Sequence, residues 1–337
     1  MTKQIEVVGG SRVYVGDARV LLQSLLPEKR VIVISDTNID RTHNDIIAAY
    51  EHILIGQGEQ AKSFSTLEEI YRQLIDMGAD RSTFILGVGG GIVTDIAGFV
   101  ATTYMRGVEF GFVTTTLLGS VDASVGGKNG VNVGGFKNMV GTFSQPKFVV
   151  CDVSLLHSLP SREFRAGLAE VLKTAILGDA ELFEILERTS FDELRGDDAL
   201  LEDVILHSVQ VKASVVAEDE REGGRRRILN LGHTLAHAIE KCSRKYNHGE
   251  AVAIGLYHTT RAALAQNLIG KSDADRIFAL IERYGFGTEL PVERKQLLKA
   301  IEGDKKRKGN TIHLIYPTKI GDVVVKVVAF ADVAKAV

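Results

Sequence analysis

The sequence predicts an α/β N-terminal domain with a Rossmann-like parallel sheet, followed by a mostly α-helical C-terminal domain, with the active site in the cleft between them. Three observations support this fold class. Short apolar runs alternate with helical patterns over residues 1–150, glycines cluster after one of these runs, and helical spacing is almost continuous from Arg162 to Glu302. A chain of 337 residues has room for two domains, each with its own core.

The composition is that of a soluble globular protein, with 45% hydrophobic and 25% charged residues. A formal net charge of −3 and the lack of tryptophan argue against a nucleic-acid-binding module, which needs a basic, aromatic-studded surface. Cys151 and Cys242 lie in an apolar run and a helical pattern, without the spacing of a disulfide or redox pair. The N-terminal "MTKQIEVVGG" lacks a secretory signal, so we expect a cytoplasmic protein.

Five unbroken apolar runs read as buried strands, because runs of this length suit a parallel sheet covered on both faces. They are "RVIVIS" (30–35), "HILI" (52–55), "TFILGV" (83–88), "FGFVTT" (110–115) and "KFVVCD" (147–152). Between the second and third runs, one apolar helical stripe is formed by Leu67, Ile70, Tyr71, Leu74 and Ile75. Ser65 or Thr66 can cap the start of this helix, and Gly78 can end it.

The run "FILGVGGGIVTDIAGFVATTY" (84–104) is long and apolar enough to raise the possibility of a membrane helix. Asp95 near its middle and three consecutive glycines both disfavour that reading. We therefore expect strand, turn and helix, and no membrane partner.

The character of the sequence changes between Asp152 and Pro160, which predicts domains at 1–152 and 153–337. The second is mostly helical. Its last two apolar runs, "TIHLIYP" (311–317) and "DVVVKVVAF" (322–330), predict a hairpin.

A glycine cluster (Gly87, Gly89, Gly90 and Gly91) lies between a predicted strand and the helix that follows it. Such glycines let the backbone approach a pyrophosphate, and the helix N-terminus favours its negative charge. Ile92 stands where a standard dinucleotide fingerprint has its third glycine, so a tight turn with close helix packing is the alternative. Asp95 is expected in the first helical turn, where the dipole favours a carboxylate, or it reaches a ribose or nicotinamide.

Two further segments follow predicted strands, where α/β sheets bind ligands. "ISDTN" offers Asp36 and Asn38, and "GQGEQAKS" offers Glu59 and Lys62. Each alone also fits an ordinary polar loop.

Three histidines fall within sixteen positions of "RRILNLGHTLAHAIEKCSRKYNHGEAVAIG". His233 and His237 are four apart on one helical face, so spacing alone favours them as a metal-binding pair. This segment lacks the glutamate base of H-E-x-x-H zinc sites. His248 opens the next helix, where a single histidine is more often a cap or core residue.

Glu170 and Lys173 lie three apart in an otherwise apolar helical pattern, and a buried carboxylate and ammonium need a reason to be there. A carboxylate here can serve as a further metal ligand. The alternative is a salt bridge on a solvated face.

A long glycine-rich loop, "SVDASVGGKNGVNVGGFKNMVGTFSQP", offers Asp122, Lys128, Lys137 and Asn138, and loops of this length are usually functional. "KASVVAEDEREGGRRRILN" adds basic and polar groups. They are Lys212, Arg226 and Asn230. A solvated surface patch is the alternative for the consecutive arginines.

Taken together, these motifs resemble the 3-dehydroquinate synthases over nearly the whole chain. The resemblance is carried, in the family's order, by "GEQAKS", "GGGIVTDIAGFVA", "TYMRG", "TTTLLGSVDASVGGK", "FKNMVG", "LPSREFRAGLAEVLKTA", "EDEREGGRRRILNLGHTLAHAIE" and "HGEAVAIG". It implies that Glu170, His233 and His248 bind the metal, Zn²⁺ or Co²⁺, while His237 lies beside the substrate. This metal set differs from the pair that spacing favours.

The resemblance also implies bound NAD in the N-terminal domain. The cofactor residues it implies are Asp36, Asn38, Glu59, Lys62, Gly90, Gly91, Ile92, Val93, Thr94, Asp95, Thr115, Thr116, Lys128, Lys137, Leu155, Leu156, His157 and Ser158. The substrate contacts it implies are Asp122, Lys128, Asn138, Lys173, Lys212, Arg226, Asn230, His237 and one lysine of "DKKRKG", Lys305 or Lys306.

Arg106 in "TYMRG" resembles the arginine that reaches the neighbouring subunit's phosphate pocket, which implies a homodimer. Three positions depart from the family. Thr94 and Ala236 replace usual glycines, and Thr114 replaces a usual proline, so local turn geometry is in question there.

The implied reaction converts 3-deoxy-D-arabino-heptulosonate 7-phosphate to 3-dehydroquinate and phosphate, in the shikimate pathway that leads to aromatic amino acids. It proceeds by transient oxidation with NAD, β-elimination of phosphate, return of the hydride and aldol closure. Two alternatives remain: another sugar-phosphate cyclase, or a metal-dependent polyol dehydrogenase of the glycerol type. The second has no use for the basic set Lys128, Lys173, Lys212 and Arg226.

Overall fold

The computed structural model describes residues 3–302, 311–330 and 333, which belong to two compact units. The first unit comprises Met1–Phe164 and Leu201–Glu220, and the second comprises Arg165–Leu200 and Arg221–Val337. A segment within the expected C-terminal domain, 201–220, thus groups with the N-terminal part of the chain. The domain limits 1–152 and 153–337 stay a prediction.

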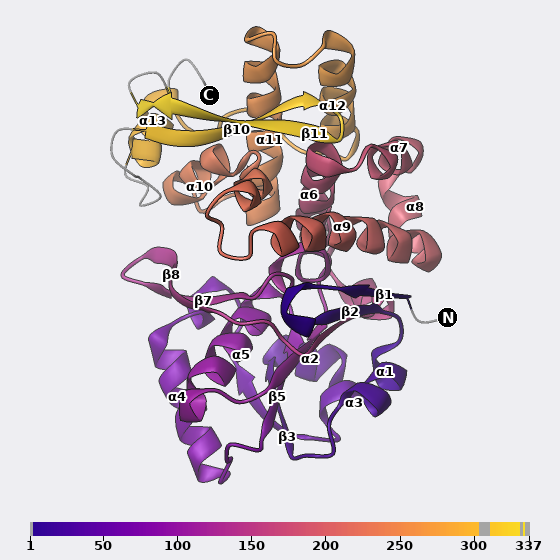
Figure 1. The fold of residues 1–337 in the computed structure, drawn as a ribbon, viewed down its shortest axis with the longest axis vertical. Coiled ribbons are helices and arrows are strands. Elements are labelled where there is room, and N and C mark those ends of the chain that lie inside the picture. Colours follow the sequence, from indigo (N-terminus) through magenta and orange to yellow (C-terminus); the bar gives the residue numbers. More distant parts are fainter. Residues whose placement is uncertain (1–2, 303–310, 331–332, 334–337) are drawn as a thin grey trace. The chain divides into compact units, whose positions relative to one another are not determined.

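Seven strands form the sheet of the first unit, in the spatial order β1-β2-β9-β6-β5-β3-β4. Among them, β1, β2, β3 and β5 are labelled in Figure 1. Neighbouring strands are parallel except β1 and β2. The strands are β1 (Lys3–Glu6), β2 (Arg12–Val15), β3 (Val31–Asp36), β4 (Glu51–Ile55), β5 (Phe84–Gly89), β6 (Phe110–Thr114) and β9 (Phe148–Cys151). The five predicted strands are confirmed. Strands β1 and β2 were not predicted, because they mix polar with apolar residues and lack an unbroken apolar run.

Helices cover both faces of this sheet. Leu22, Ile39 and Ile47, from three of the helices, join one core cluster with strand residues such as Leu86 and Val113. On the opposite face α5 packs closely, because a Cβ at Gly87 would lie 2.9 Å from Ala97 Cβ. The helices of this unit are α1 (Ala18–Leu25), α2 (Thr37–Thr42), α3 (Asn44–Ile47), α4 (Phe64–Asp76), α5 (Gly91–Thr103) and, for its residues 201–218, α9 (Asp198–Glu218).

Helix α4 begins earlier than its sequence predicts. Ser63 is the N-cap, and its Oγ accepts a hydrogen bond from Thr66 N at 3.3 Å. The expectation of Ser65 or Thr66 as cap was wrong, because the helix already begins at Phe64 and includes both residues. The stripe is confirmed for Leu67, Ile70 and Leu74, which are buried, and Tyr71 is partly buried. Ile75 was wrongly included, because it lies at the end of the helix and is 65% exposed.

The glycine-rich segment is not the long loop expected from its composition. It forms a π-helical turn (η4, Gly119–Ala123) and a hairpin of β7 (Lys128–Val133) and β8 (Phe136–Phe143), and β7 packs against α5. Gly134 and Gly135 have φ of 57° and 80°, which a two-residue hairpin turn favours. Turn glycines were therefore mistaken for loop glycines.

Residues 84–104 form β5, a glycine turn and α5, as predicted. None of the helices in the described part of the chain is long and apolar enough to cross a membrane.

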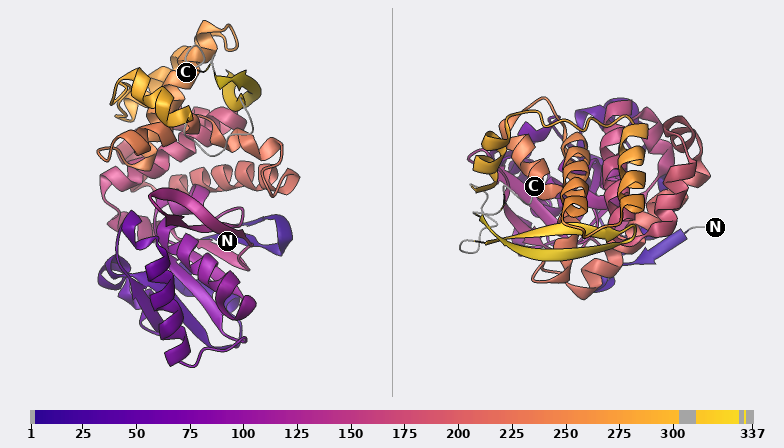
Figure 2. Two further views of the ribbon diagram at one scale, coloured as in Figure 1. Left: turned by 90° about the vertical axis from the view of Figure 1, so that its left-hand side faces the viewer. Right: turned by 90° about the horizontal axis from the view of Figure 1, so that it is seen from above.

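The second unit is mostly helical and ends in the predicted hairpin, whose β10 packs on α11 (Figure 2). Short 3-10 helices join several elements of the chain. They are η1 (Val8–Gly10), η2 (Glu59–Ala61), η3 (Tyr104–Arg106), η5 (Val153–Ser158) and η6 (Arg225–Asn230). The remaining elements are α6 (Ser161–Gly178), α7 (Ala180–Arg188), α8 (Phe191–Gly196), α10 (His233–Cys242), α11 (His248–Ala265), α12 (Lys271–Arg283), α13 (Arg294–Glu302), β10 (Thr311–Lys319) and β11 (Asp322–Ala329).

Candidate active site

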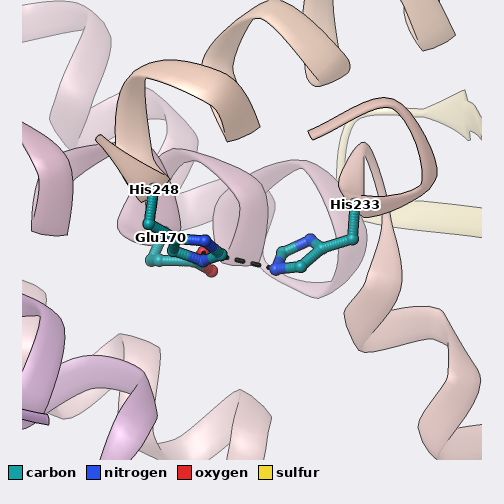
Figure 3. A group of neighbouring side chains, drawn as sticks. All are labelled: Glu170, His233 and His248. Carbon is teal, nitrogen blue, oxygen red and sulfur yellow. Dashed lines mark hydrogen bonds and ion pairs between the residues drawn. The ribbon is translucent and has the colours of Figure 1, made fainter. Parts of the chain in front are cut away.

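Three side chains from three helices of the second unit converge on one point (Figure 3). Glu170 lies in the middle of α6, His233 is the first residue of α10, and His248 is the first residue of α11. One ligand atom from each residue lies within 4.8 Å of the others. His233 Nε2 is 3.5 Å and His248 Nε2 is 3.0 Å from Glu170 Oε1.

The starts of α10 and α11 fix both histidines. Gly232, which precedes His233, has a left-handed φ of 75°, and a Cβ there would lie 2.9 Å from Leu256 N. Asn247 and Glu250 form a capping box around His248, with both side-chain to backbone hydrogen bonds at 2.9 Å. Both rings therefore project from the N-terminal ends of their helices at defined positions.

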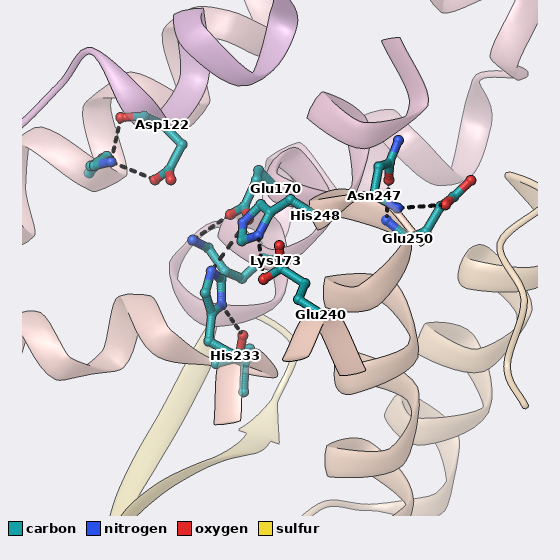
Figure 4. A network of polar contacts seen from close by, with 10 residues as sticks. Asp122, Glu170, Lys173, His233, Glu240, Asn247, His248 and Glu250 are labelled. Carbon is teal, nitrogen blue, oxygen red and sulfur yellow. Dashed lines mark hydrogen bonds and ion pairs between the residues drawn. The ribbon is translucent and has the colours of Figure 1, made fainter. Parts of the chain in front are cut away.

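Each histidine ring is also held through its second nitrogen. His233 Nδ1 donates to the carbonyl of Leu231 at 3.1 Å, and His248 Nδ1 donates to Glu240 Oε2 at 3.3 Å (Figure 4). A carbonyl only accepts, so the proton of the neutral His233 ring lies on Nδ1 and its Nε2 lone pair faces Glu170. His248 lies between two carboxylates, Glu240 at Nδ1 and Glu170 at Nε2, so as an imidazolium it donates to both. A metal ion at Nε2 would take the place of the second proton and leave the first on Nδ1.

Burial and charge set the protonation of this group. Burial lowers the pKa of His233 to about 3, so this ring is neutral near pH 7. Burial opposes charge on His248 as well, but its contacts with Glu170 and Glu240 outweigh burial and raise its pKa to about 10. For Glu170, burial favours the neutral acid, yet Lys173, His233 and His248 together hold its pKa well below the usual range.

Glu170 and Lys173 form a buried ion pair rather than a bridge on a solvated face. Lys173 Nζ lies 2.5 Å from Glu170 Oε2, and the two residues are 2% and 0% exposed. Removing one partner of such a buried pair strongly destabilises the fold, because it leaves the other charge buried without compensation. The pair holds a carboxylate ionised inside a helical core.

These residues fit a divalent metal. Two imidazole nitrogens and one carboxylate oxygen are the protein ligands of one class of catalytic zinc site, which leaves a further position for water or substrate. Ring nitrogens that donate outward to a carbonyl or carboxylate are typical of metal-binding histidines. When both rings are neutral, two ring nitrogens and one carboxylate oxygen face one another, and all three are acceptors. A metal cation can bind to all three.

His237 lies one helical turn after His233, with ring centroids 5.5 Å apart. Among the described residues, the convergent group contains His248 and not His237. The geometry therefore favours His248 over His237 as the second histidine, because His248 reaches Glu170 from a different helix. The ligand set stays a prediction.

Arg226 and Asn230 lie in η6 of the same unit. Arg226 is 2% exposed, so it is not part of a solvated surface patch. Asn230 Nδ2 donates to Glu222 Oε1 at 2.6 Å, and Glu222 has a positive φ of 60°. Strained backbone of this kind is found at functional sites.

In the first unit, the glycine turn leads into the N-terminus of α5. Gly90 is the N-cap, and a Cβ there would lie 2.9 Å from Thr116 Cγ2. Asp95 lies beyond the first turn of the helix, contrary to expectation, because α5 begins at Gly91. Thr94 fits without disturbing the helix, since its Oγ1 donates to the Gly91 carbonyl at 3.1 Å.

Lys62 joins several of the expected cofactor and substrate residues. Its Nζ donates to Asp95 Oδ2 and, at 2.5 Å, to Asn138 Oδ1, and Lys62 is only 5% exposed. Burial raises the pKa of Asp95, although Lys62 opposes this shift. Lys137 Nζ lies 3.8 Å from Glu59 Oε2, so this cluster also includes the polar edge of the β7–β8 hairpin.

A second buried lysine, Lys212 of α9, contacts the π-helical turn. Its Nζ lies 2.5 Å from both the carbonyl and the Oδ1 of Asp122. Lys128, the first residue of β7, is exposed. Lys212 and Asp122 are thus brought together, as the family resemblance implies.

The other predicted residues have more local roles. Asp36 caps α2, accepting from Asn38 N at 2.8 Å, and Ser158 Oγ lies 2.7 Å from His43 Nε2. Arg106 is exposed. Among the remaining expected cofactor residues, Val93, Thr115, Leu155 and Leu156 are buried, Ile92 and Thr116 are partly exposed, and His157 is exposed. Lys305 lies outside the described residues.

Glu240 and Glu222 are polar partners that the sequence analysis missed. Glu240 follows His233 by seven positions on α10, two helical turns along the same face, so the spacing was available as a signal. Glu222 has no comparable signal, because it lies outside regular structure.

Comparison with known proteins agrees with these features. The 3-dehydroquinate synthase N-terminal family matches residues 52–166, and the C-terminal family matches residues 167–307. A 3-dehydroquinate synthase of Pelobacter propionicus is 45% identical over 81% of this chain and 77% of its own length.

Solved structures of similar fold include two other synthases. A 2-deoxy-scyllo-inosose synthase, complexed with carbaglucose-6-phosphate, NAD⁺ and Co²⁺, is 25% identical, covers 99% of this chain and 98% of its own, and has a TM-score of 0.88. The 2-epi-5-epi-valiolone synthase of Streptomyces hygroscopicus subsp. jinggangensis 5008, with NAD⁺ and Zn²⁺ bound, is 26% identical, with 99% and 96% coverage and a TM-score of 0.87.

Proposed function

The chain belongs to the 3-dehydroquinate synthase family, and from this premise we propose that it converts 3-deoxy-D-arabino-heptulosonate 7-phosphate to 3-dehydroquinate and phosphate. The enzyme is then a phosphorus–oxygen lyase of the shikimate pathway. One observation carries the proposal: the carboxylate of Glu170 and the imidazoles of His233 and His248 converge on a single point. Both imidazoles can bind a metal ion when they are neutral.

Glu170, His233 and His248 would hold the metal, Zn²⁺ or Co²⁺. When bound, such an ion supplies a Lewis acid that stabilises negative charge on substrate oxygens. Lys173 keeps Glu170 ionised by contact with the oxygen opposite the convergent side. The bound NAD⁺ and Co²⁺ or Zn²⁺ of the two synthases of similar fold support this choice of cofactors.

NAD would bind in the first unit, at the glycine turn and the Lys62 cluster. NAD supplies a reversible hydride acceptor, so it is regenerated in each turnover. Gly90 and Gly91 let the backbone approach the pyrophosphate at the α5 N-terminus. Lys62 and Asp95 place a cation and a carboxylate beside that turn.

The phosphate and the carboxylate of the substrate would be held by charge-assisted hydrogen bonds from four basic residues, Lys128, Lys173, Lys212 and Arg226. Asp122 orients Lys212 through the short contact at Nζ. His237, whose ring lies beside that of His233, would exchange a proton with the substrate. Departing phosphate can take up a proton itself, so a dedicated base for the elimination is unnecessary.

The proposal includes a homodimer in which Arg106 reaches the phosphate pocket of the neighbouring subunit. It also includes a location in the cytoplasm. The exposure of Arg106 is compatible with such a role. The buried cations Lys173, Lys212 and Arg226 favour a sugar phosphate over the polyol of a glycerol-type dehydrogenase. The activity of another sugar-phosphate cyclase remains the second candidate. The two other synthases of similar fold are 25% and 26% identical to this chain, compared with 45% for the 3-dehydroquinate synthase of Pelobacter propionicus.

One assay tests the function. Metal-loaded protein is given NAD and the heptulosonate phosphate, and phosphate release and NADH absorbance are followed together. We expect phosphate over many turnovers with no net NADH. NADH without phosphate would identify a dehydrogenase, and activity only with other sugar phosphates would identify another cyclase.

A pair of variants tests the residue roles. His233→Ala should lose bound metal and turnover together, whereas His237→Ala should keep its metal and lose turnover. Metal analysis and the phosphate assay read the two properties separately. Loss of metal from His237→Ala, with retention in His233→Ala, would reverse the assignment.

A further inference from the structure

Glu240 has no role in the ligand set, yet it contacts one of its members. It lies near the end of α10, with its side chain 9% exposed, and its Oε2 is 3.3 Å from His248 Nδ1 (Figure 4). His248 belongs to α11, so this contact joins the two helices that carry the histidines. A carboxylate in a nearly buried position needs a partner of opposite charge or a donor.

The two histidines differ in this outer contact. The Nδ1–H of His233 is held by the backbone carbonyl of Leu231, which no side-chain substitution removes. The Nδ1–H of His248 is held by a carboxylate on another helix. His248 is also the more exposed of the two, with 30% of its side chain accessible against 10% for His233, so less packing restrains its ring.

We infer that Glu240 is a positioning residue for metal binding, which fixes the ring and tautomer of His248 so that its Nε2 lone pair points at the site of the ion. The inference rests on the proposed metal site. Glu240 acts in two ways. Its oxygen orients the ring, and its negative charge makes the imidazole a stronger donor to a cation.

These two effects can be separated by substitution. Glu240→Gln keeps an amide oxygen that accepts from Nδ1 but removes the charge, whereas Glu240→Ala removes both. Loss of such an outer partner typically weakens metal binding by about 10- to 100-fold. We expect Glu240→Ala in that range and Glu240→Gln between it and the unchanged protein.

The test measures metal affinity directly, without turnover. The full chain is stripped of metal, and Co²⁺ or Zn²⁺ is titrated in competition with a chromogenic chelator. Glu282→Ala is the matched control, because it removes an exposed glutamate from α12 of the same unit. The Co²⁺ absorption spectrum adds a second readout, since a misoriented ring changes the coordination geometry.

Equal affinities for Glu240→Ala and the unchanged protein would overturn the inference while leaving the metal site intact. A protein that binds neither ion in any form would instead overturn the metal site of the proposed function, and this inference with it. Thermal unfolding with and without metal distinguishes a purely structural role, which would lower the midpoint equally in both forms. We expect the increase in midpoint on adding metal to be smaller in Glu240→Ala than in the unchanged protein, and an equal increase in both would count against a role through the ion.

Discussion

In the first unit the buried lysines Lys62 and Lys212 each contact a carboxylate, Asp95 and Asp122, whereas in the second unit two histidines and Glu170 crowd one point beside Lys173. The first arrangement balances opposite charges within the protein. The second balances Glu170 with Lys173 on its far oxygen and with a proton on His248. The first region can therefore bind a ligand by adding contacts, whereas a metal ion in the second region would have to replace the proton on His248.

The largest effect is expected where the second region loses its carboxylate. Glu170→Gln keeps the side-chain shape, removes a ligand charge and leaves Lys173 buried without its counter-ion. Breaking a buried pair in this way costs about 3–5 kcal/mol. We expect loss of bound metal and a fall of that size in the free energy of urea-induced unfolding of the metal-free protein.

The double variant Glu170→Gln/Lys173→Met serves as its control. Replacing both partners of a buried pair is often nearly neutral, so stability should largely return while metal binding does not. If Glu170→Gln alone were as stable as the unchanged protein, the buried pair would not be the source of the imbalance.

The next prediction concerns the proton that the metal replaces. His248 holds a proton below its pKa of about 10 in the metal-free protein, while His233, with a pKa of about 3, does not. Metal binding must release the His248 proton, so affinity should rise about tenfold per pH unit between pH 6 and 9. Chelator competition at several pH values measures the slope, and an affinity that does not change with pH would contradict this protonation scheme.

In the first region, Lys62→Met removes one partner of a pair that is already balanced. A hydrogen bond to a charged group contributes roughly 1.5–3 kcal/mol, so we expect NAD affinity to fall about tenfold or more, with metal affinity unchanged. Fluorescence titration with NADH measures the first, and a parallel loss of metal affinity would show that the two regions are coupled.

The same variant has a pH signature. Burial already raises the pKa of Asp95, and loss of Lys62 raises it further. A carboxyl whose folded-state pKa is raised binds more protons when folded, so stability increases as pH falls toward that pKa. Relative to the unchanged protein, Lys62→Met should therefore gain stability between pH 7 and 5, as read from urea midpoints.

The smallest effect is expected from the backbone of the glycine turn. Gly90 has a φ of −79°, which alanine adopts freely, so Gly90→Ala acts through its close approach to the Thr116 side chain, 2.9 Å from Cγ2 and 3.3 Å from Oγ1. Overpacking of this kind costs about 1–3 kcal/mol, with a few-fold loss of NAD affinity expected. Adding Thr116→Ser removes the Cγ2 atom and keeps the Oγ that accepts a hydrogen bond from Gly119 N. The double variant should therefore regain both the stability and the NAD affinity of the unchanged protein. An unrestored double variant would place the strain elsewhere.

Much of the fold could be predicted, because its signals are local. The five predicted strands are unbroken apolar runs, and the C-terminal hairpin consists of two apolar runs joined by a two-residue turn, Ile320 and Gly321. Strands β1 and β2 escaped prediction, since four residues with mixed side chains carry little pattern. The β7–β8 hairpin was mistaken for a loop, because glycine marks turns and loops alike.

The candidate site was predictable to a different extent. The residues of the metal group follow from the resemblance, and the burial of Glu170 and Lys173 followed from the apolar residues around them. The contact between Lys62 and Asn138, 76 positions apart, has no local signal. It exists because the hairpin that carries Asn138 packs on α5, which also carries Asp95.

By itself, the sequence determined the α/β and helical halves, the glycine turn and the residue types available for metal and anion binding, since periodicity and turn chemistry act between near neighbours. Without the family resemblance, only the tertiary structure shows that His248 rather than His237 joins His233 at Glu170, and that Glu240 contacts it. Helical spacing relates residues on one helix, whereas His248 and Glu170 meet through the packing of separate helices, which depends on side chains distributed along the chain.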